Sequence, residues 1–326
     1  MLLQSLFFGL GLVGLYYTAE WLVKGASRIA WTLGMTPVVV GLTVVAFGTS
    51  APELVVSSVA AVKGQGDVSM GNVVGSNIMN IALILGVCAI IKAIHVDRSF
   101  IRREIPIVIA TALLLPLIGW DGIISRIEAI ALLAAFVLFI HSSLRAAKKE
   151  PPGVDDQFRE YEEASGYGAE KEGKLWLNIG LVVAGVVGLV VSAHLLVTSA
   201  VFFAHALGVS ELVIGLTIIA VGTSLPEMAT SIVAARRNEP EIAFGNVIGS
   251  NIFNVLLILG AAAAIRPISV NPSLLRFEIP ISIVASLALV PLVYPRRRLG
   301  RFGGALLLVL YVAFTVVLLL NARTGA

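Results

Sequence analysis

Residues 41–85 begin with GLTVVAFGTSAPELVVSS and end with GNVVGSNIMNIALIL, and residues 215–259 begin with GLTIIAVGTSLPEMATSI and end with GNVIGSNIFNVLLIL. The two stretches align at a constant offset of 174 residues without a gap, and 24 of the 45 positions are identical. Each copy places one glutamate, Glu53 or Glu227, inside a long apolar run. We expect the rest of the chain to be a scaffold that brings these two glutamates together.

The composition indicates an integral membrane protein. Of the 326 residues, 58% are hydrophobic and 13% are charged, whereas a soluble domain has about 25% charged residues. The net charge of +3 is small, so the composition gives no reason to expect a nucleic-acid partner. The single cysteine, Cys88, cannot form a disulfide within the chain.

Ten apolar runs are long enough to cross a bilayer, at about 20 residues each. They are residues 2–23, 36–62, 70–93, 103–120, 124–145, 175–203, 210–235, 244–265, 277–294 and 302–321. The first run has no preceding Lys or Arg, which a secretory signal needs, so we interpret it as a retained span.

The offset of 174 also relates residues outside the two motifs, for example Gly11 with Gly185. We therefore expect an all-α membrane protein of ten transmembrane helices, built as two five-helix repeats. Because five is odd, the second repeat would enter the membrane from the opposite side, which is an inverted-topology repeat typical of secondary transporters. The predicted divisions are residues 1–146, a linker at 147–173, and 174–326. The linker is polar and acidic, has no EF-hand spacing, and is interpreted as a solvated connection.

The distribution of cations predicts the orientation. With both termini outside, the loops on the inner side contain 18 of the 23 Lys and Arg residues and the outer loops contain 5. The positive-inside rule favours this arrangement, with the linker in the cytoplasm. The short linker and the lack of a targeting segment favour a prokaryotic plasma (inner) membrane.

The doubled stretch groups oxygen atoms. Thr49 and Glu53 are four residues apart and share a helix face with Ser50 beside them. Pro52 lacks an N–H group, so carbonyls near Ala46 can turn away from the helix. The third span contributes Ser76 and Asn80, and the second copy repeats the set with Ala220, Thr223, Ser224, Glu227, Ser250 and Asn254.

Two carboxylates with hydroxyl, amide and carbonyl oxygens form a hard-oxygen shell without sulfur or imidazole. Such a shell suits Ca²⁺ and, by the same argument, Na⁺, but not Zn²⁺ or Cu²⁺. A carboxylate at mid-bilayer costs about 2.5–3.5 kcal/mol on insertion scales, and we place no Lys or Arg deep in a span to balance either glutamate. A bound cation is therefore the expected partner.

The pair GTSAPEL…GNVVGSNIMN and GTSLPEM…GNVIGSNIFN resembles the alpha-repeats of the calcium/cation antiporter superfamily, in particular its sodium/calcium exchanger family of prokaryotic type. The resemblance covers both halves. It implies ten helices, a mid-membrane site, and exchange of Ca²⁺ for Na⁺ by alternating access, with no cofactor besides the transported ions. It also implies that Ca²⁺ lies between Glu53 and Glu227. The hydroxyls of Thr49, Thr223, Ser50, Ser224, Ser76 and Ser250 and the carbonyls of Ala46 and Ala220 would then complete this site and the flanking sodium sites.

One departure from the family concerns charge. Some exchangers have an aspartate at one of the positions of Asn80 and Asn254, where this chain has two asparagines. The site would carry a formal charge of −2, which one Ca²⁺ or two Na⁺ would balance and three Na⁺ would exceed by one. The ion ratio is left open, and transport current measured against calcium flux would determine it.

Three other functions remain as alternatives. The nearest is exchange of Ca²⁺ for H⁺ or another cation on the same fold. A channel is disfavoured because conduction requires weaker, multi-site binding than two buried carboxylates provide. An enzyme is disfavoured because neither copy contains a Gly-x-Ser-x-Gly or His-Glu-x-x-His element.

Spans one and six contain no expected ion ligand, and the resemblance implies that they slide as a gate. Glu20 and His194 occupy equivalent positions in these two spans. Glu20 can pair with Lys24 one turn away, and we place His194 near the outer surface. Packing between helices is the expected role of both residues, with pH sensing or gating as the alternative.

Overall fold

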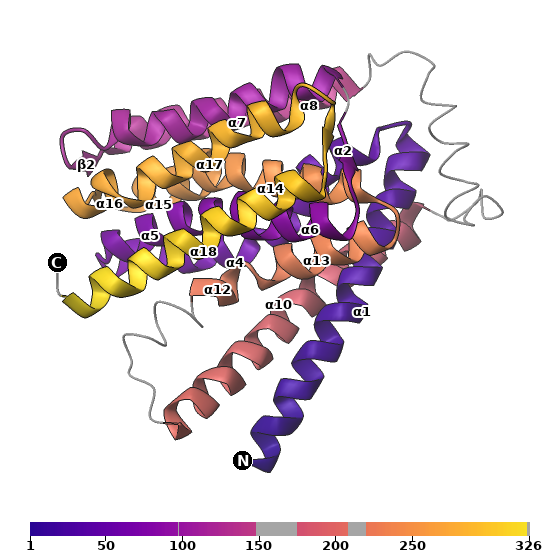
Figure 1. Cartoon of the computed structure of the whole chain (residues 1–326), viewed down its shortest axis with the longest axis horizontal. Coiled ribbons are helices and arrows are strands. Elements are labelled where there is room, and N and C mark those ends of the chain that lie inside the picture. The colour runs from indigo at the N-terminus through magenta and orange to yellow at the C-terminus, as the bar shows by residue number, and fades with distance from the viewer. Residues whose placement is uncertain (97, 148–174, 208–219, 325–326) are drawn as a thin grey trace.

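The computed structural model describes residues 1–96, 98–147, 175–207 and 220–324, and this part of the chain is almost entirely helical (Figure 1). The predicted linker lies outside the described residues except for Ala147. The first ten residues of the predicted span 210–235 also lie outside them.

The first half contains eight α-helices, two π-helical segments and two very short strands. In chain order they are α1 (Leu2–Leu33), α2 (Pro37–Val40), η1 (Gly41–Val45), α3 (Ala46–Thr49), α4 (Ala51–Val62), α5 (Gly66–Ile78), η2 (Met79–Leu85), α6 (Gly86–Ile91), β1 (Ile94–His95), α7 (Arg98–Ile118), β2 (Ile123–Ile124) and α8 (Arg126–Ala147).

The described part of the second half follows the same order. It consists of α10 (Leu175–Ala206), α12 (Ala220–Thr223), α13 (Leu225–Arg236), α14 (Pro240–Phe253), η4 (Asn254–Leu259), α15 (Gly260–Ile265), β3 (Ile268–Ser269), α16 (Pro272–Arg276), α17 (Glu278–Val293), β4 (Arg298–Leu299) and α18 (Arg301–Thr324).

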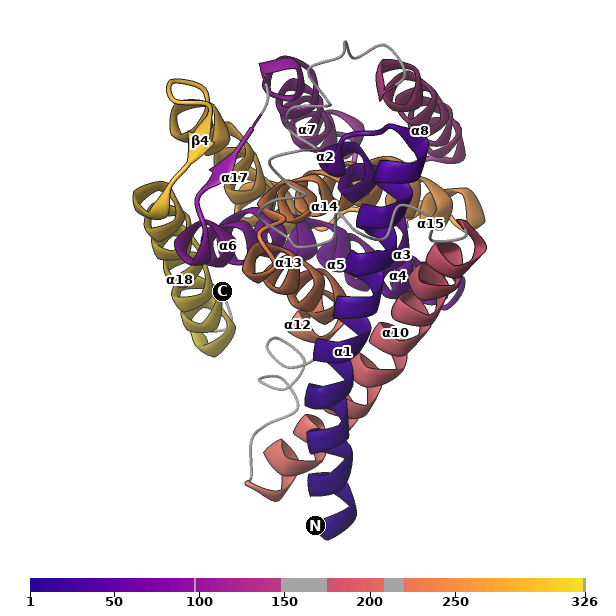
Figure 2. The same cartoon turned by 90° about the vertical axis from the view of Figure 1, so that its right-hand side faces the viewer.

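Helices α1 and α10 lie side by side and project from the rest of the molecule (Figures 1 and 2). Helix α1 continues ten residues beyond the predicted span, because nothing interrupts it before Gly34, whose φ of 63° ends the helix in the left-handed conformation. The two helices touch at glycines. A Cβ atom at Gly11 would lie 2.9 Å from the backbone nitrogen of Leu196, and one at Gly185 would lie 2.7 Å from that of Leu22.

Each doubled stretch contains a break before its proline. Ser50 separates α3 from α4, and the helical segments on its two sides are bent by 45°. Ser224 separates α12 from α13 in the same way. Pro52 and Pro226 follow these serines and cannot donate the helical hydrogen bond, which is the local cause of both breaks.

Two short antiparallel bridges join the halves, which the sequence did not predict. Strand β1 pairs with β4, and β2 pairs with β3. Figure 1 places β2 at the left-hand end of the molecule, and in Figure 2, which turns the right-hand side of that view forward, β4 lies toward the viewer. We call these ends the β1–β4 face and the β2–β3 face.

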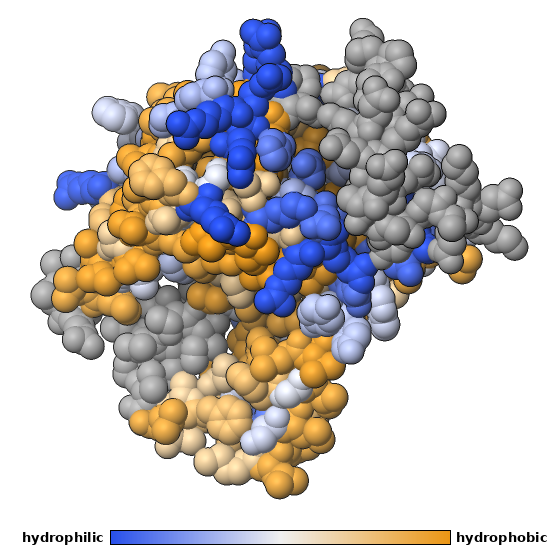
Figure 3. Space-filling view, turned by 45° about the vertical axis from the view of Figure 1, so that its right-hand side comes forward, coloured by the Kyte–Doolittle hydropathy of each residue, from blue (hydrophilic) through white to orange (hydrophobic). Residues whose placement is uncertain are grey.

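Seven described helical segments are long and apolar enough to cross a membrane, or eight if the bent pair Pro37–Thr49 and Ala51–Val62 counts as one span. The predicted span 103–120 falls on α7, which is not among them and has Arg102, Arg103 and Glu104 near its start. In Figure 3 the surface is mostly hydrophobic in the lower part, where α1 and α10 project, and the strongly hydrophilic residues lie above it among further hydrophobic areas. Such a surface fits contact with lipid.

Candidate cation site

The two helix breaks meet through reciprocal hydrogen bonds. The Ser50 hydroxyl donates to Oε1 of Glu227 over 3.0 Å, and the Ser224 hydroxyl donates to Oε1 of Glu53 over 3.1 Å. Both glutamates are 1% exposed, and their carboxyl groups interact electrostatically with each other. The two residues that the sequence places in separate halves therefore share one buried site.

Two further serines complete a group of hydroxyls. Ser50 Oγ lies 3.0 Å from Ser250 Oγ, and Ser224 Oγ lies 3.2 Å from Ser76 Oγ. Ser76 belongs to α5 and Ser250 to α14, so the second helix after the break in each half contacts the break in the other half. All four predicted serines are buried and lie next to the carboxylates.

The two predicted threonines bind asparagines that the sequence analysis did not single out. Thr49 donates to Oδ1 of Asn246 over 3.0 Å, and Thr223 donates to Oδ1 of Asn72 over 3.3 Å. The Asn72 amide also donates to the Ser57 hydroxyl over 2.9 Å and to the Glu53 carbonyl over 3.3 Å.

Asn246 repeats these bonds in the other half, to the Ser231 hydroxyl at 3.0 Å and to the Glu227 carbonyl at 3.5 Å. Each amide thus ties a threonine of one half to the glutamate-bearing helix of the other. Both asparagines stand in the repeated GNV motif at the 174-residue offset, and this recurrence in an apolar run was the signal that could have identified them.

Several buried side-chain oxygens in the described part of the chain have no hydrogen-bond partner, and four of them belong to predicted site residues. These four are Oε2 of Glu53 and Glu227 and Oδ1 of Asn80 and Asn254. A buried acceptor without a partner costs about 1–3 kcal/mol, and a buried carboxylate costs more. Four such oxygens in one region, all acceptors, are the arrangement that a bound cation would satisfy.

A second unpredicted pair orients one of these amides. The Asn254 amide donates to Oδ1 of Asn77 over 3.0 Å, and the Asn251 amide donates to the Asn77 carbonyl over 3.2 Å. Because the Asn254 nitrogen is held in this way, its oxygen is left available as an acceptor. Asn77 and Asn251 are themselves equivalent at the 174-residue offset.

The structure gives fewer contacts for the two predicted carbonyl ligands, Ala46 and Ala220, than for the side-chain ligands. The Ala46 carbonyl accepts the Ser50 N–H over 3.0 Å and lies 3.4 Å from Oγ1 of Thr49. It therefore stays within helical hydrogen bonding, and only its second lone pair is available to an ion. Ala220 begins α12, and its side chain lies outside the described residues.

The partners of both glutamates in the described part of the chain are hydroxyls rather than cations. Another buried carboxylate differs in this respect, because Glu104 pairs with Arg103 at 3.0 Å. Among the described residues, no group of three or more His, Cys, Asp or Glu could hold a metal ion. A cation at this site would therefore depend on neutral oxygens together with two carboxylates, as hard ions do.

Comparisons with known proteins identify the family. The family described as sodium/calcium exchanger protein matches residues 3–144 and 177–320. The chain is 39% identical to the putative antiporter CaxA of Alkalimonas amylolytica over 98% of this chain and 99% of that one. It is 36% identical to the sodium/calcium exchanger MaX1 of Methanosarcina acetivorans over 95% and 96% of the two chains.

A solved structure shows the same fold. The sodium-calcium exchanger NCX_Mj, soaked with zero Na⁺ and Ca²⁺, matches with a TM-score of 0.82 and 33% identity, covering 97% of this chain and 99% of that one.

Proposed function

Because the chain belongs to the sodium/calcium exchanger family, we propose that it exchanges Ca²⁺ for Na⁺ across a membrane by alternating access. One observation within the molecule supports this most directly, namely the four unpaired buried oxygens of Glu53, Glu227, Asn80 and Asn254. An enzyme would need a nucleophile with a base of suitable geometry, whereas here every side chain around the carboxylates offers an oxygen to a hard cation.

In this proposal Ca²⁺ binds between the two carboxylates, and Na⁺ ions take the same oxygens in turn. The serine hydroxyls that now donate to Glu53 and Glu227 would rotate to present lone pairs to the ion, because a hydroxyl is both donor and acceptor. Asn72 and Asn246 would keep the threonine hydroxyls in place during this exchange. The site residues are those of the sequence analysis, with these two asparagines added as positioning residues.

The proposed architecture is ten transmembrane helices in two inverted repeats. Paired contacts at the 174-residue offset support it, including the reciprocal serine–glutamate bonds and the two bridges at opposite ends of the molecule. Two inverted repeats can exchange conformations, which gives two states related by a pseudo-two-fold axis, each opening the central site to one side, and this is the physical basis of alternating access.

The proposed orientation puts the β1–β4 face in the cytoplasm. Described cations gather there, including Lys92, Arg237, Arg298 and Arg301, which is the distribution that the positive-inside rule associates with a cytoplasmic side. The chain would then reside in a prokaryotic inner membrane with both termini outside.

Calcium uptake by proteoliposomes tests the proposal. Vesicles loaded with Na⁺ and diluted into Na⁺-free buffer should accumulate ⁴⁵Ca²⁺, and vesicles with a pH gradient at zero Na⁺ should not. Uptake driven only by the pH gradient would instead establish the alternative Ca²⁺/H⁺ exchange. A channel would be recognised by calcium entry that does not saturate and needs no counter-ion.

A further inference from the structure

The two faces of the molecule differ in how α1 and α10 cover the core. Helix α1 packs extensively on α13, whereas α10 hardly touches α4, the counterpart of α13. Val233 of α13 is 4% exposed, and the equivalent Val59 of α4 is 46% exposed. The paired helices therefore close one side of the core and leave the equivalent surface of the other side uncovered.

Two polar contacts join α1 to the core on the covered side. Glu20 of α1 forms an ion pair with Arg237 at the end of α13, and their side chains are only 21% and 28% exposed. Ser27 of α1 donates to the buried Glu239, which directly precedes α14. We call these two contacts the α1 latch. Both join α1 to the core at the β1–β4 face, next to the Lys92–Asn238 hydrogen bond.

The 174-residue offset shows what the corresponding contacts at the β2–β3 face would be. Glu20 and Arg237 correspond to His194 and Lys63, and Ser27 and Glu239 correspond to Val201 and Gln65. The first pair has no negative charge, and the second pairs an apolar side chain with an amide. The chain can thus form an ion pair and a carboxylate hydrogen bond when α1 closes on α13, and neither when α10 closes on α4.

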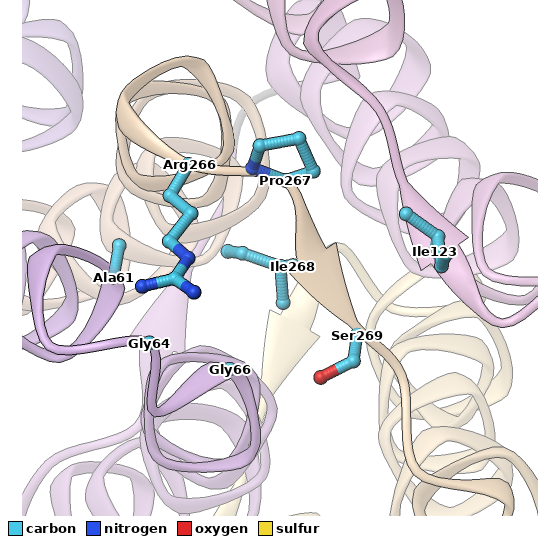
Figure 4. A pocket seen from close by; sticks show the side chains of 8 residues that line it. All are labelled: Ala61, Gly64, Gly66, Ile123, Arg266, Pro267, Ile268 and Ser269. Carbon is cyan, nitrogen blue, oxygen red and sulfur yellow. The ribbon is translucent and has the colours of Figure 1, made fainter.

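The β2–β3 face also contains a pocket at the positions equivalent to the Lys92–Asn238 hydrogen bond of the β1–β4 face. A cavity of about 200 Å³ is lined by Ala61, Gly64, Gly66, Ile123, Arg266, Pro267, Ile268 and Ser269 (Figure 4). Arg266 reaches over Gly64, whose counterpart at the β1–β4 face is Asn238, the partner of Lys92. At several equivalent positions, the two faces therefore differ in the ion pairs and hydrogen bonds that their side chains can form.

We propose that the α1 latch holds the β1–β4 face closed, so that the protein rests with its cation site open toward the β2–β3 face. The proposal deepens the exchange function above and rests on it for the meaning of the two states. On the orientation proposed here, the resting site faces outward, and the latch must break in each transport cycle. A contact made in only one of two states shifts their populations by its own free energy.

Cross-linking measures the two populations directly. The Lys63→Cys/His194→Cys pair, in a Cys88→Ser background, reports closure of α10 on α4, since these residues correspond to the joined Glu20 and Arg237. With the latch intact, a short bifunctional thiol reagent should join the pair slowly. Adding Arg237→Gln should speed the reaction about two- to five-fold, the effect of losing one partly exposed ion pair.

Two controls make the result specific. Arg236→Gln removes the same charge from the adjacent, exposed residue and should leave the cross-linking rate unchanged. The exchanged pair Glu20→Arg/Arg237→Glu restores an ion pair and should restore the slow rate. Equal rates in the intact and Arg237→Gln proteins would overturn the proposal, as would a fast rate in the exchanged pair.

Calcium uptake by proteoliposomes containing the same protein tests the exchange function separately from the latch. Absence of sodium-driven uptake by the protein with an unaltered latch would reject Ca²⁺/Na⁺ exchange, whereas the ratio of cross-linking rates judges the latch without reference to any transported ion.

Discussion

The two copies of the repeat make matching contacts at the centre of the molecule but carry different residues at its two faces. At the centre, Ser50 and Ser224, Thr49 and Thr223, and Asn72 and Asn246 make matching contacts in both halves. At the faces, equivalent positions carry unlike residues, as with Glu20 and His194. A site that must serve both sides of a membrane needs symmetry, whereas the resting state depends on what differs between the sides.

The comparison also separates two kinds of buried carboxylate. Glu53 and Glu227 lie among hydroxyls, while Glu104 is paired with Arg103. A carboxylate that serves packing can be balanced by a neighbouring cation of the protein. One that serves an ion is balanced only when the ion binds, so the cost of burial is offset by binding.

The largest expected effect concerns the glutamates at the centre. Glu53→Gln or Glu227→Gln removes half of the formal charge of the site, and sodium-driven ⁴⁵Ca²⁺ uptake should fall on the order of 100-fold or more. The two variants should be affected alike, because the contacts of the two glutamates match.

The exposed Asp67 on α5 provides the control for these variants, since Asp67→Asn removes a carboxylate outside the site and should leave uptake unchanged. Calcium uptake that survives in both glutamine variants would remove the site assignment.

A smaller effect is expected for the positioning asparagines. Asn246→Ala leaves Ser231 without its buried partner, at about 1–3 kcal/mol, and frees Thr49 to turn toward the Val45 and Ala46 carbonyls, so the apparent calcium affinity should weaken about ten- to a hundred-fold. Asn72→Ala should weaken it less, because Asn72 is half-buried whereas Asn246 is fully buried. Isotope-binding titrations measure both, and a larger loss for Asn72→Ala would show that burial does not set the difference.

The smallest expected effect lies in the contact between α1 and α10. Gly185→Ala forces a Cβ atom to within 2.7 Å of the Leu22 backbone, so overpacking should lower the Tm in detergent by about 2–6 °C. A Cβ atom at Gly180 of the same helix would meet no other atom within 4 Å, so Gly180→Ala is the matched control. An unchanged Tm in Gly185→Ala would indicate that the two helices are not packed as tightly as the structure has them.

The sequence was sufficient for the family and for the pairing of the halves at the site. Its strongest signal was the repeat itself, because an identical Thr-Ser-x-Pro-Glu in two apolar runs has no packing explanation. It missed Asn72 and Asn246, although the repeat marked these two amides as clearly as those of Asn80 and Asn254.

Other features could not be predicted from one sequence. The β1–β4 and β2–β3 bridges are two residues long, which is below the length at which strand patterns become visible. The pairing of Glu20 with Arg237 links residues 217 positions apart, whereas local spacing offered Lys24 instead. Tertiary contacts of this kind depend on the relative placement of the halves, which side-chain periodicity does not encode.

The reciprocal serine–glutamate bonds make each half of the chain incomplete by itself. A fragment ending before residue 148 would contain Glu53 but lack the hydroxyl of Ser224, and a fragment beginning at residue 175 would contain Glu227 but lack that of Ser50. Co-expressed, the two fragments would regain a binding site only by docking with each other, so calcium retention would become a direct assay of their assembly. The ion site is thus shared between two polypeptide segments, and neither contains all of its ligands.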